Sequence, residues 1–237
     1  MKKFATLVLA LTALPALAFA GDGGSRQSSD YTLSQERPSS PTSEHFVFDY
    51  VNPNDPEAKP PAVEKVVTRL PNTAHFDSSV PGSCTATDAE LMAQGADACP
   101  ESSAIGGGVI TVDTGVPGPG RFITADTLFF NNAEDPDGEF IYLNTARGTE
   151  GRTVIRADVT RRRTITGVFP PLPGTPPDGG SIDTVDVTVA DVRSGGDAFI
   201  TTPRQCPQDG SWRPAVRFSY QDGVTQTVAS EAPCIGS

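Results

Sequence analysis

The feature that most constrains this fold is the way glycine and proline interrupt its apolar segments. The chain contains 23 glycines and 22 prolines among 237 residues. From residue 45 onward these residues separate short runs rich in β-branched and aromatic side chains. Long helices do not persist through such interruptions, whereas short strands joined by turns do. The pattern predicts an all-β fold with about ten strands.

Several of these runs alternate apolar and polar residues, as expected of strands that bury one face. The clearest examples are residues 182–192, where the valines share one side, and Arg152–Thr160. Asp222–Gly223 lies between two such runs and predicts a hairpin, because both central positions of a type I′ turn need positive φ. A second hairpin is predicted from the runs 127–130 and 140–143. This spacing favours a two-sheet antiparallel β-sandwich of the jelly-roll or immunoglobulin-like type.

The N-terminus has the features of an export signal. Lys2 and Lys3 precede an uncharged apolar run that ends at Ala20, so residues 1–20 are predicted to be a cleavable signal peptide. No second apolar stretch reaches spanning length, and we therefore expect no membrane span and an extracellular or cell-envelope location. Residues 21–44 are rich in serine, proline and glycine and predict a disordered leader. Residues 45–237 then form a single β-sandwich domain.

The four cysteines stand in two close pairs, Cys84 with Cys99 and Cys206 with Cys234. Four cysteines allow three pairings. Proximity and an oxidising destination favour the two local disulfides. A metal site is the alternative, but the chain has no C-x-x-C motif and only two histidines.

One short helix is predicted between the first two cysteines. Thr87 can cap its N-terminus, Glu90 can complete a capping box, and Gly95 can end it in a left-handed conformation. A helix this short is marginal alone, and a disulfide between Cys84 and Cys99 would tie its flanks together.

The charge of the chain argues against a nucleic-acid partner. The formal net charge is −11, and such an acidic surface repels phosphate groups. The one local reversal is Arg161–Arg163, which either binds an acidic polymer or forms an exposed turn between Thr160 and Thr164. The turn is the favoured interpretation, because charge at a strand end discourages edge pairing.

No set of residues indicates a catalytic mechanism. His75, Asp77 and Ser78 are close in sequence, but a catalytic triad requires side chains that converge in space. The Gly-x-Ser-x-Gly nucleophile motif is absent. Whether the protein is an enzyme stays open at this point, and the residues favour a non-catalytic role.

The loop between residues 131 and 139 is a candidate Ca²⁺ site. Its oxygen-bearing side chains are Asn131, Glu134, Asp135, Asp137 and Glu139. Carboxylate and amide oxygens suit Ca²⁺, but the spacing does not match an EF-hand, and a solvated hairpin loop is the favoured interpretation. The same acids underlie the alternative function, an extracellular hydrolase that uses acidic residues and Ca²⁺.

Three aromatic residues, Tyr142, Trp212 and Tyr220, are candidate ligand-binding residues. Their rings would contact a cell-wall polysaccharide or a surface protein. With no catalytic set in view, the sequence predicts a secreted, non-catalytic domain that binds a cell-envelope glycan or a surface partner.

Two segments resemble a module of secreted proteins in high-GC Gram-positive actinobacteria. They are Cys84–Gly95, followed by Cys99-Pro100 and Gly106–Gly108, and Thr201–Pro207, followed by Trp212, Tyr220–Gly223 and Cys234. The resemblance covers most of residues 45–237 and consists of structural markers. It implies a secreted all-β domain in an uncharacterised group and supplies no catalytic residues.

Overall fold

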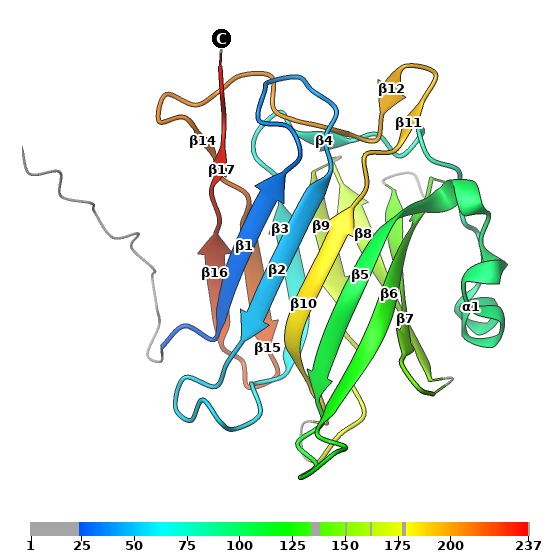
Figure 1. Cartoon of the computed structure of the whole chain (residues 1–237), viewed down its shortest axis with the longest axis vertical. Helices are drawn as coiled ribbons and strands as arrows, with labels where there is room; N and C mark the ends of the chain where they lie inside the picture. The colour runs from blue at the N-terminus through cyan, green and yellow to red at the C-terminus, as the bar shows by residue number, and fades with distance from the viewer. Residues whose placement is uncertain (1–23, 134–137, 150, 162, 177–178, 237) are drawn as a thin grey trace, which may run out of the picture.

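The computed structural model describes residues 24–133, 138–149, 151–161, 163–176 and 179–236. Its strands form one continuous antiparallel sheet that curls into a nearly barrel-shaped wall around a shared interior (Figure 1). In spatial order the eleven strands are β1 (Gln27–Leu33), β2 (Glu44–Tyr50), β10 (Ser181–Val189), β5 (Ala104–Asp113), β6 (Phe122–Asn132), β7 (Glu139–Ala146), β8 (Arg152–Thr160), β9 (Thr164–Val168), β3 (Val63–Arg69), β15 (Ala215–Tyr220) and β16 (Thr225–Ala229).

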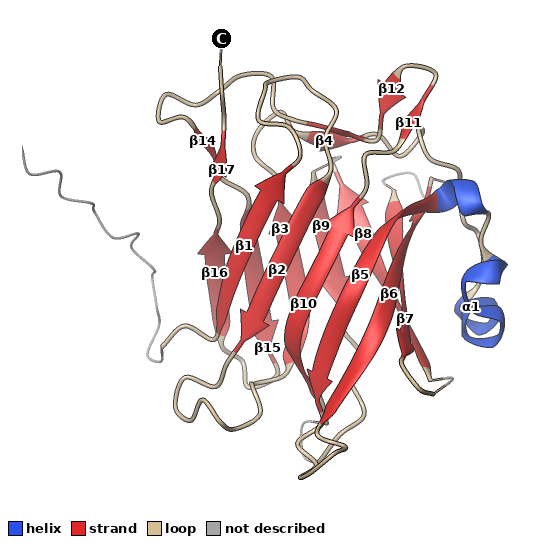
Figure 2. Cartoon of the chain, viewed as in Figure 1, coloured by secondary structure: helices blue, strands red, loops and turns tan. Residues whose placement is uncertain are grey.

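Smaller elements surround this sheet, and strands dominate the fold (Figure 2). Two-stranded ribbons pair β4 (His75–Phe76) with β13 (Ile200–Thr201), β11 (Arg193–Ser194) with β12 (Asp197–Ala198), and β14 (Ser211–Trp212) with β17 (Ala232–Pro233). The helical elements are α1 (Asp88–Gln94) and the single turns η1 (Gly95–Ala98) and η2 (Glu101–Ser103). The all-β prediction with one short α-helix is confirmed.

The expected two-sheet sandwich is not confirmed, because the main strands belong to a single curled sheet. The glycines of β5 help to explain the curvature. A Cβ on Gly108 would lie 2.0 Å from the Asp186 carbonyl oxygen, so only glycine permits this approach of β5 to β10. Register shifts at Ala104/Gly106 and Ile182/Thr184 add further bends on the same two strands. Strand spacing in the sequence cannot distinguish two stacked sheets from one sheet that bends in this way.

The first and last strands of the sheet, β1 and β16, meet through side chains. The Gln226 amide accepts a hydrogen bond from Arg26 N at 3.0 Å and donates one to the Gly24 carbonyl at 3.1 Å. Arg26 also forms an ion pair with Asp222 at 2.8 Å. We call this contact the seam.

The prediction of a disordered leader over residues 21–44 is wrong from Gln27 onward. Gln27–Leu33 forms β1 and pairs along its whole length with β2. Tyr31 is buried in the interior, and few other apolar residues are needed because the backbone ladder supplies much of the attachment. The proposed signal peptide, residues 1–20, lies outside the described residues.

Both predicted hairpins are confirmed. β15 and β16 pair across Asp222–Gly223, and β6 pairs with β7. The expected type I′ turn is wrong, because Gly223 has φ of 84° but Asp222 does not have a positive φ. The inward faces of β8 and β10 carry the apolar residues predicted for them.

Both predicted disulfides are present, Cys84–Cys99 and Cys206–Cys234, with Cα separations of 5.0 and 5.5 Å. The first joins the flanks of α1, which has the predicted capping box. Leu91 packs with Phe130 and Ile141 against the outer face of the sheet. Within the described ranges, no helix has the length and apolar character needed to cross a membrane.

Candidate functional site

A cavity of about 240 Å³ lies inside the curled sheet, at the end where β5 turns into β6 and β7 into β8. Inward-facing side chains of β5, β6, β7, β8 and β10 form most of its wall, and the segment after β9 closes one side. Its apolar lining consists of Ile110, Val112, Ile123, Ala125, Ala146, Ile155, Phe169, Leu172, Pro173 and Ile182.

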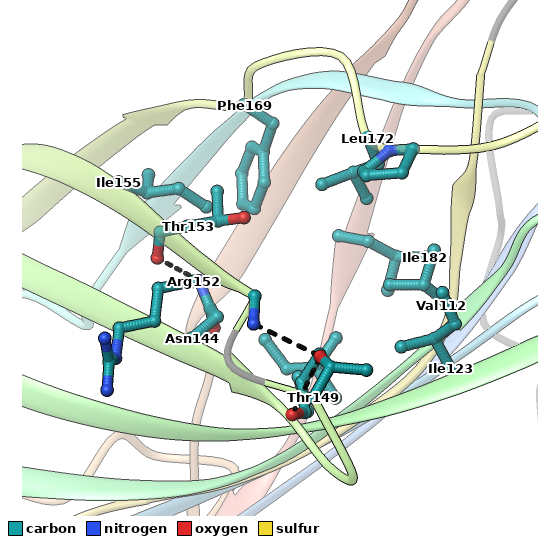
Figure 3. Close-up of a pocket in the computed structure, with 15 residues that line it drawn as sticks. Val112, Ile123, Asn144, Thr149, Arg152, Thr153, Ile155, Phe169, Leu172 and Ile182 are labelled. Atoms are coloured by element: carbon teal, nitrogen blue, oxygen red, sulfur yellow. Dashed lines mark hydrogen bonds between the residues drawn. The ribbon is translucent and has the colours of Figure 1, made fainter. Parts of the chain in front are cut away.

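Residues of two connecting segments border the cavity on its solvent side. Thr149, Gly151 and Pro173 line it and are exposed. Leu172 and Ile182 project toward the same space (Figure 3). The Arg152 guanidinium points away from the cavity and donates a hydrogen bond to the Met92 carbonyl at 2.9 Å. The cavity is therefore an apolar space with a route to solvent, and no cation is directed into it from the described part of its wall.

A second cavity of about 110 Å³ lies beside the first. The residues common to both linings are Ile110, Asn144, Ile155, Phe169 and Ile182. Its other walls are largely aromatic and aliphatic, and they include Phe48, Phe129 and Phe218. An apolar cavity of about 150 Å³ is enough to bind benzene, so the larger cavity has room for a bigger molecule.

Thr149, Arg152 and Thr153 are polar residues in the lining of the larger cavity, and a further polar pair lies where the two cavities adjoin. Thr127 on β6 and Asn144 on β7 are direct cross-strand partners on the inner face. The Asn144 amide nitrogen donates to the Thr153 carbonyl at 3.4 Å, whereas the buried Asn144 Oδ1 and Thr127 Oγ1 have no hydrogen-bond partner among the described residues. Asn144 lines both cavities, and Thr127 lines the smaller one.

The candidate Ca²⁺ ligands that can be placed do not converge. Asn131 faces the interior opposite Phe140, and its amide donates to the carbonyls of Ser78 and Gly82, both at 3.0 Å. Glu139 lies on the other face of the hairpin and forms an ion pair with Arg156 at 2.6 Å. Glu134, Asp135 and Asp137 lie outside the described residues. Among the residues that are described, no group of three or more histidine, cysteine or acidic side chains is placed to hold a metal.

The three aromatic candidates do not form an exposed glycan-binding face. Trp212 and Tyr220 are each 1 % exposed. The Trp212 indole donates to the Gln205 carbonyl at 3.0 Å, and the Tyr220 hydroxyl donates to Gln27 Oε1. Tyr142 instead lines the smaller cavity, where burial raises the pKa of its phenol above the ordinary value. Of the three, only Tyr142 is near the candidate site.

Among the described residues, neither histidine is hydrogen-bonded to a serine. Asp77 Oδ1 accepts hydrogen bonds from the backbone and hydroxyl of Ser79, at 3.1 and 2.6 Å, which stabilises a local turn. His45 forms an exposed pair with Asp186 at 2.8 Å on the outer face of the sheet. The turn contains Ser78 and Ser79, whereas His75 precedes it in β4, which pairs with β13.

Arg161 and Arg163 lie in the turn between β8 and β9, as predicted, and Arg162 lies outside the described residues. Arg161 and Arg163, together with Arg69 of β3, line a cleft of about 700 Å³. Arg163 donates to Asn72 Oδ1 at 2.5 Å. In the part of the chain that the structure describes, none of these three arginines forms an ion pair.

A buried carboxyl group lies in the interior at the start of β2. Glu44 is 2 % exposed and accepts a hydrogen bond from the Tyr31 hydroxyl at 2.8 Å. Burial raises the pKa of Glu44 to about 7, although the hydrogen bond from Tyr31 acts in the opposite direction. Neither cavity is lined by Glu44.

Sequence reasoning missed the residues that line the cavities, apart from Tyr142. Their alternation along β5 and β6 was available as a signal for inward faces. It could not show where the interior remains unfilled, because that depends on how side chains from several strands meet.

Comparison with known proteins adds no relative: the chain matches no protein-family model, no curated protein and no solved structure.

Proposed function

We propose that this protein is an exported, non-catalytic binding protein that holds a small, mostly apolar molecule in the larger cavity. The observation that carries the proposal is the cavity itself, about 240 Å³ of apolar space with a route to solvent. Binding sites for small molecules are typically apolar hollows with a few polar groups, and the interior of a curled sheet is one of their common locations.

The lining supports binding better than catalysis. Its described side chains include no aspartate, glutamate, histidine or cysteine. General acid–base and nucleophilic catalysis rely mainly on such groups placed within reach of the substrate. The hydrolase alternative receives no support from Asn131 and Glu139, which lie on opposite faces of one hairpin.

Export is supported by the two disulfides and by the signal-like N-terminal sequence. Attachment to a cell-envelope glycan or a surface partner stays a prediction. The burial of Trp212 and Tyr220 removes two of the three aromatic residues that suggested it.

The proposal is tested by titrating n-butylbenzene into the purified protein and following backbone amide shifts by NMR. Binding should shift amides of β5, β6 and β7 around the cavity. The variant Ala146→Leu places extra side-chain volume in the cavity wall and should abolish these shifts. The matched control is Thr145→Leu, which adds a similar side chain on the opposite face of β7.

Wild-type protein that shows no saturable shifts with n-butylbenzene or comparable alkylbenzenes would refute the proposal. Equal binding by the Ala146→Leu variant would also refute it, because the ligand would then occupy another place.

A further inference from the structure

We propose that the bound molecule is a neutral alcohol or phenol whose hydroxyl group lies at the junction of the two cavities, between Asn144 and Thr127. This inference rests on the proposed function and specifies the chemical class of its ligand. The observation behind it is the pair of unpartnered polar atoms, Asn144 Oδ1 and Thr127 Oγ1, in a wall that is otherwise almost entirely apolar.

The two polar atoms belong to neighbouring positions. Thr127 and Asn144 face each other across β6 and β7, and both point inward. Thr127 is 1 % exposed, so solvent does not satisfy its hydroxyl. Buried polar groups without a partner destabilise a fold, and valine and leucine have nearly the same shapes without that cost. The polar side chains at positions 127 and 144 are therefore explained by a bound molecule that forms hydrogen bonds with them.

The hydrogen bonds already present define what that partner must offer. The Asn144 nitrogen is engaged by the Thr153 carbonyl, which leaves Oδ1 as an acceptor that requires a donor. The Thr127 hydroxyl can donate or accept. A ligand hydroxyl matches both groups, since it donates to Asn144 and accepts from Thr127.

A charged ligand group fits this place poorly. A carboxylate or ammonium would leave water for an apolar space and would need an opposite charge. Arg152, the one charged residue in the larger cavity's described lining, directs its guanidinium outward to the Met92 carbonyl. The smaller cavity has no charged residue in its lining. The hydroxyl-bearing molecule is therefore neutral.

The test compares two probes of nearly the same shape, 4-propylphenol and 4-propyltoluene, by calorimetry or NMR titration with the full chain. The water-to-cyclohexane partition coefficients of the two probes give the ratio of affinities expected for a site that offers no hydrogen bonds. In wild-type protein, the affinity for the phenol relative to the toluene should exceed this ratio. Asn144→Leu and Thr127→Val should each weaken binding of the phenol by about tenfold, as expected for loss of a buried hydrogen bond. Binding of the toluene should be unchanged or tighter in both variants.

Thr145→Val is the matched control, because it removes a hydroxyl from the outward face of β7 beside Asn144. It should leave both affinities unchanged. If Asn144→Leu does not fold, Thr127→Val and the wild-type comparison with the partition ratio still decide the question.

The outcomes separate this inference from the proposed function. If the ratio of the two affinities equals the ratio of the partition coefficients, and if neither variant changes it, hydroxyl recognition is overturned. The apolar site would still stand in that case. Failure of both probes to bind wild-type protein would overturn the proposed function as well.

Discussion

Glu44 is the residue whose environment differs most from that expected of its type. Its carboxyl group is buried, Oε1 accepts from the Tyr31 hydroxyl, and Oε2 has no partner among the described residues. Burial raises the pKa of Glu44 from 4.5 to about 7. The folded protein consequently holds a proton on this group at pH values where the unfolded chain has released it.

The first prediction at the residue scale concerns pH. Because the folded-state pKa is raised, the contribution of Glu44 to stability is complete below pH 4.5 and is lost as the pH rises through about 7. The loss should be about 2–3 kcal/mol between about pH 5 and about pH 8, from the 1.36 kcal/mol per pKa unit. Urea denaturation of wild-type protein and of Glu44→Gln at both pH values measures it, and the variant should lack this part of the dependence.

Tyr31 provides the control for this pH effect. Its hydrogen bond lowers the pKa of Glu44, so Tyr31→Phe should raise that pKa further and move the loss of stability to higher pH. Identical pH dependence in wild-type protein and Glu44→Gln would show that the carboxyl group is not buried as described.

Residues with a local role were the ones that could be predicted from the sequence. Thr87 and Glu90 form a capping box because both partners lie within one helical turn. Asn144 and Thr127 could not be identified in this way. Their importance depends on the strand register and on the space that Phe169 and Ile155 leave beside them. The sequence around Asn144 and Thr127 shows neither the register nor this space.

At the scale of elements, α1 and its disulfide form a unit on the outer face of the sheet. Leu91 and Cys84 pack there with Phe130, Ile141 and Leu143. The cavity lies on the inner face of the same strands. This separation means that the helix can be weakened without removing the cavity wall.

Replacing both Cys84 and Cys99 by serine should destabilise the protein by about 3 kcal/mol, the value expected for a closed loop of this length. Hydrogen exchange of the amides in Asp88–Gln94 should accelerate, while binding of n-butylbenzene to the folded fraction should persist. The control is the Cys206→Ser, Cys234→Ser pair, which should leave exchange in α1 unchanged. Unaltered protection of α1 in the first variant would contradict the assigned role.

The predictions for elements succeeded where turn chemistry was explicit and failed where composition alone was used. Asp222–Gly223 predicted a hairpin through the backbone conformation that Gly223 adopts. The polar composition of residues 21–44 predicted disorder, yet β1 is held by its ladder with β2 and by a few inward residues such as Tyr31. Backbone pairing with the strand that follows in the chain leaves little trace in composition.

At the scale of the whole molecule, the seam is the place where the wall is joined by side chains. Gln226→Ala should leave Arg26 N and the Gly24 carbonyl without their partners and cost about 1–3 kcal/mol. Urea denaturation measures the loss, and hydrogen exchange should accelerate first in β1 and β16. Thr227→Ala, at the exposed neighbouring position, serves as the control and should change stability little. Faster exchange confined to β5 and β6 would contradict this description.

The overall architecture was predictable only in outline. Strand content, antiparallel pairing and the disulfides follow from local patterns, whereas the single curled sheet depends on close approaches such as Gly108 to Asp186. The cavity follows from that curvature, because strands arranged around a common interior need not fill it completely.

The seam also has a consequence for the order in which this molecule is made. Arg26 and Asp222, which meet across it, are separated by 196 positions in the chain. During synthesis β1 can pair with the next strand, β2, but its contact with β16 waits for almost the entire remaining chain, whereas β5, β6, β7 and β8 pair with one another in consecutive segments. Closing such a distant contact is slow compared with forming local hairpins. The wall is therefore completed last, and the newly made chain exposes two sheet edges until it closes.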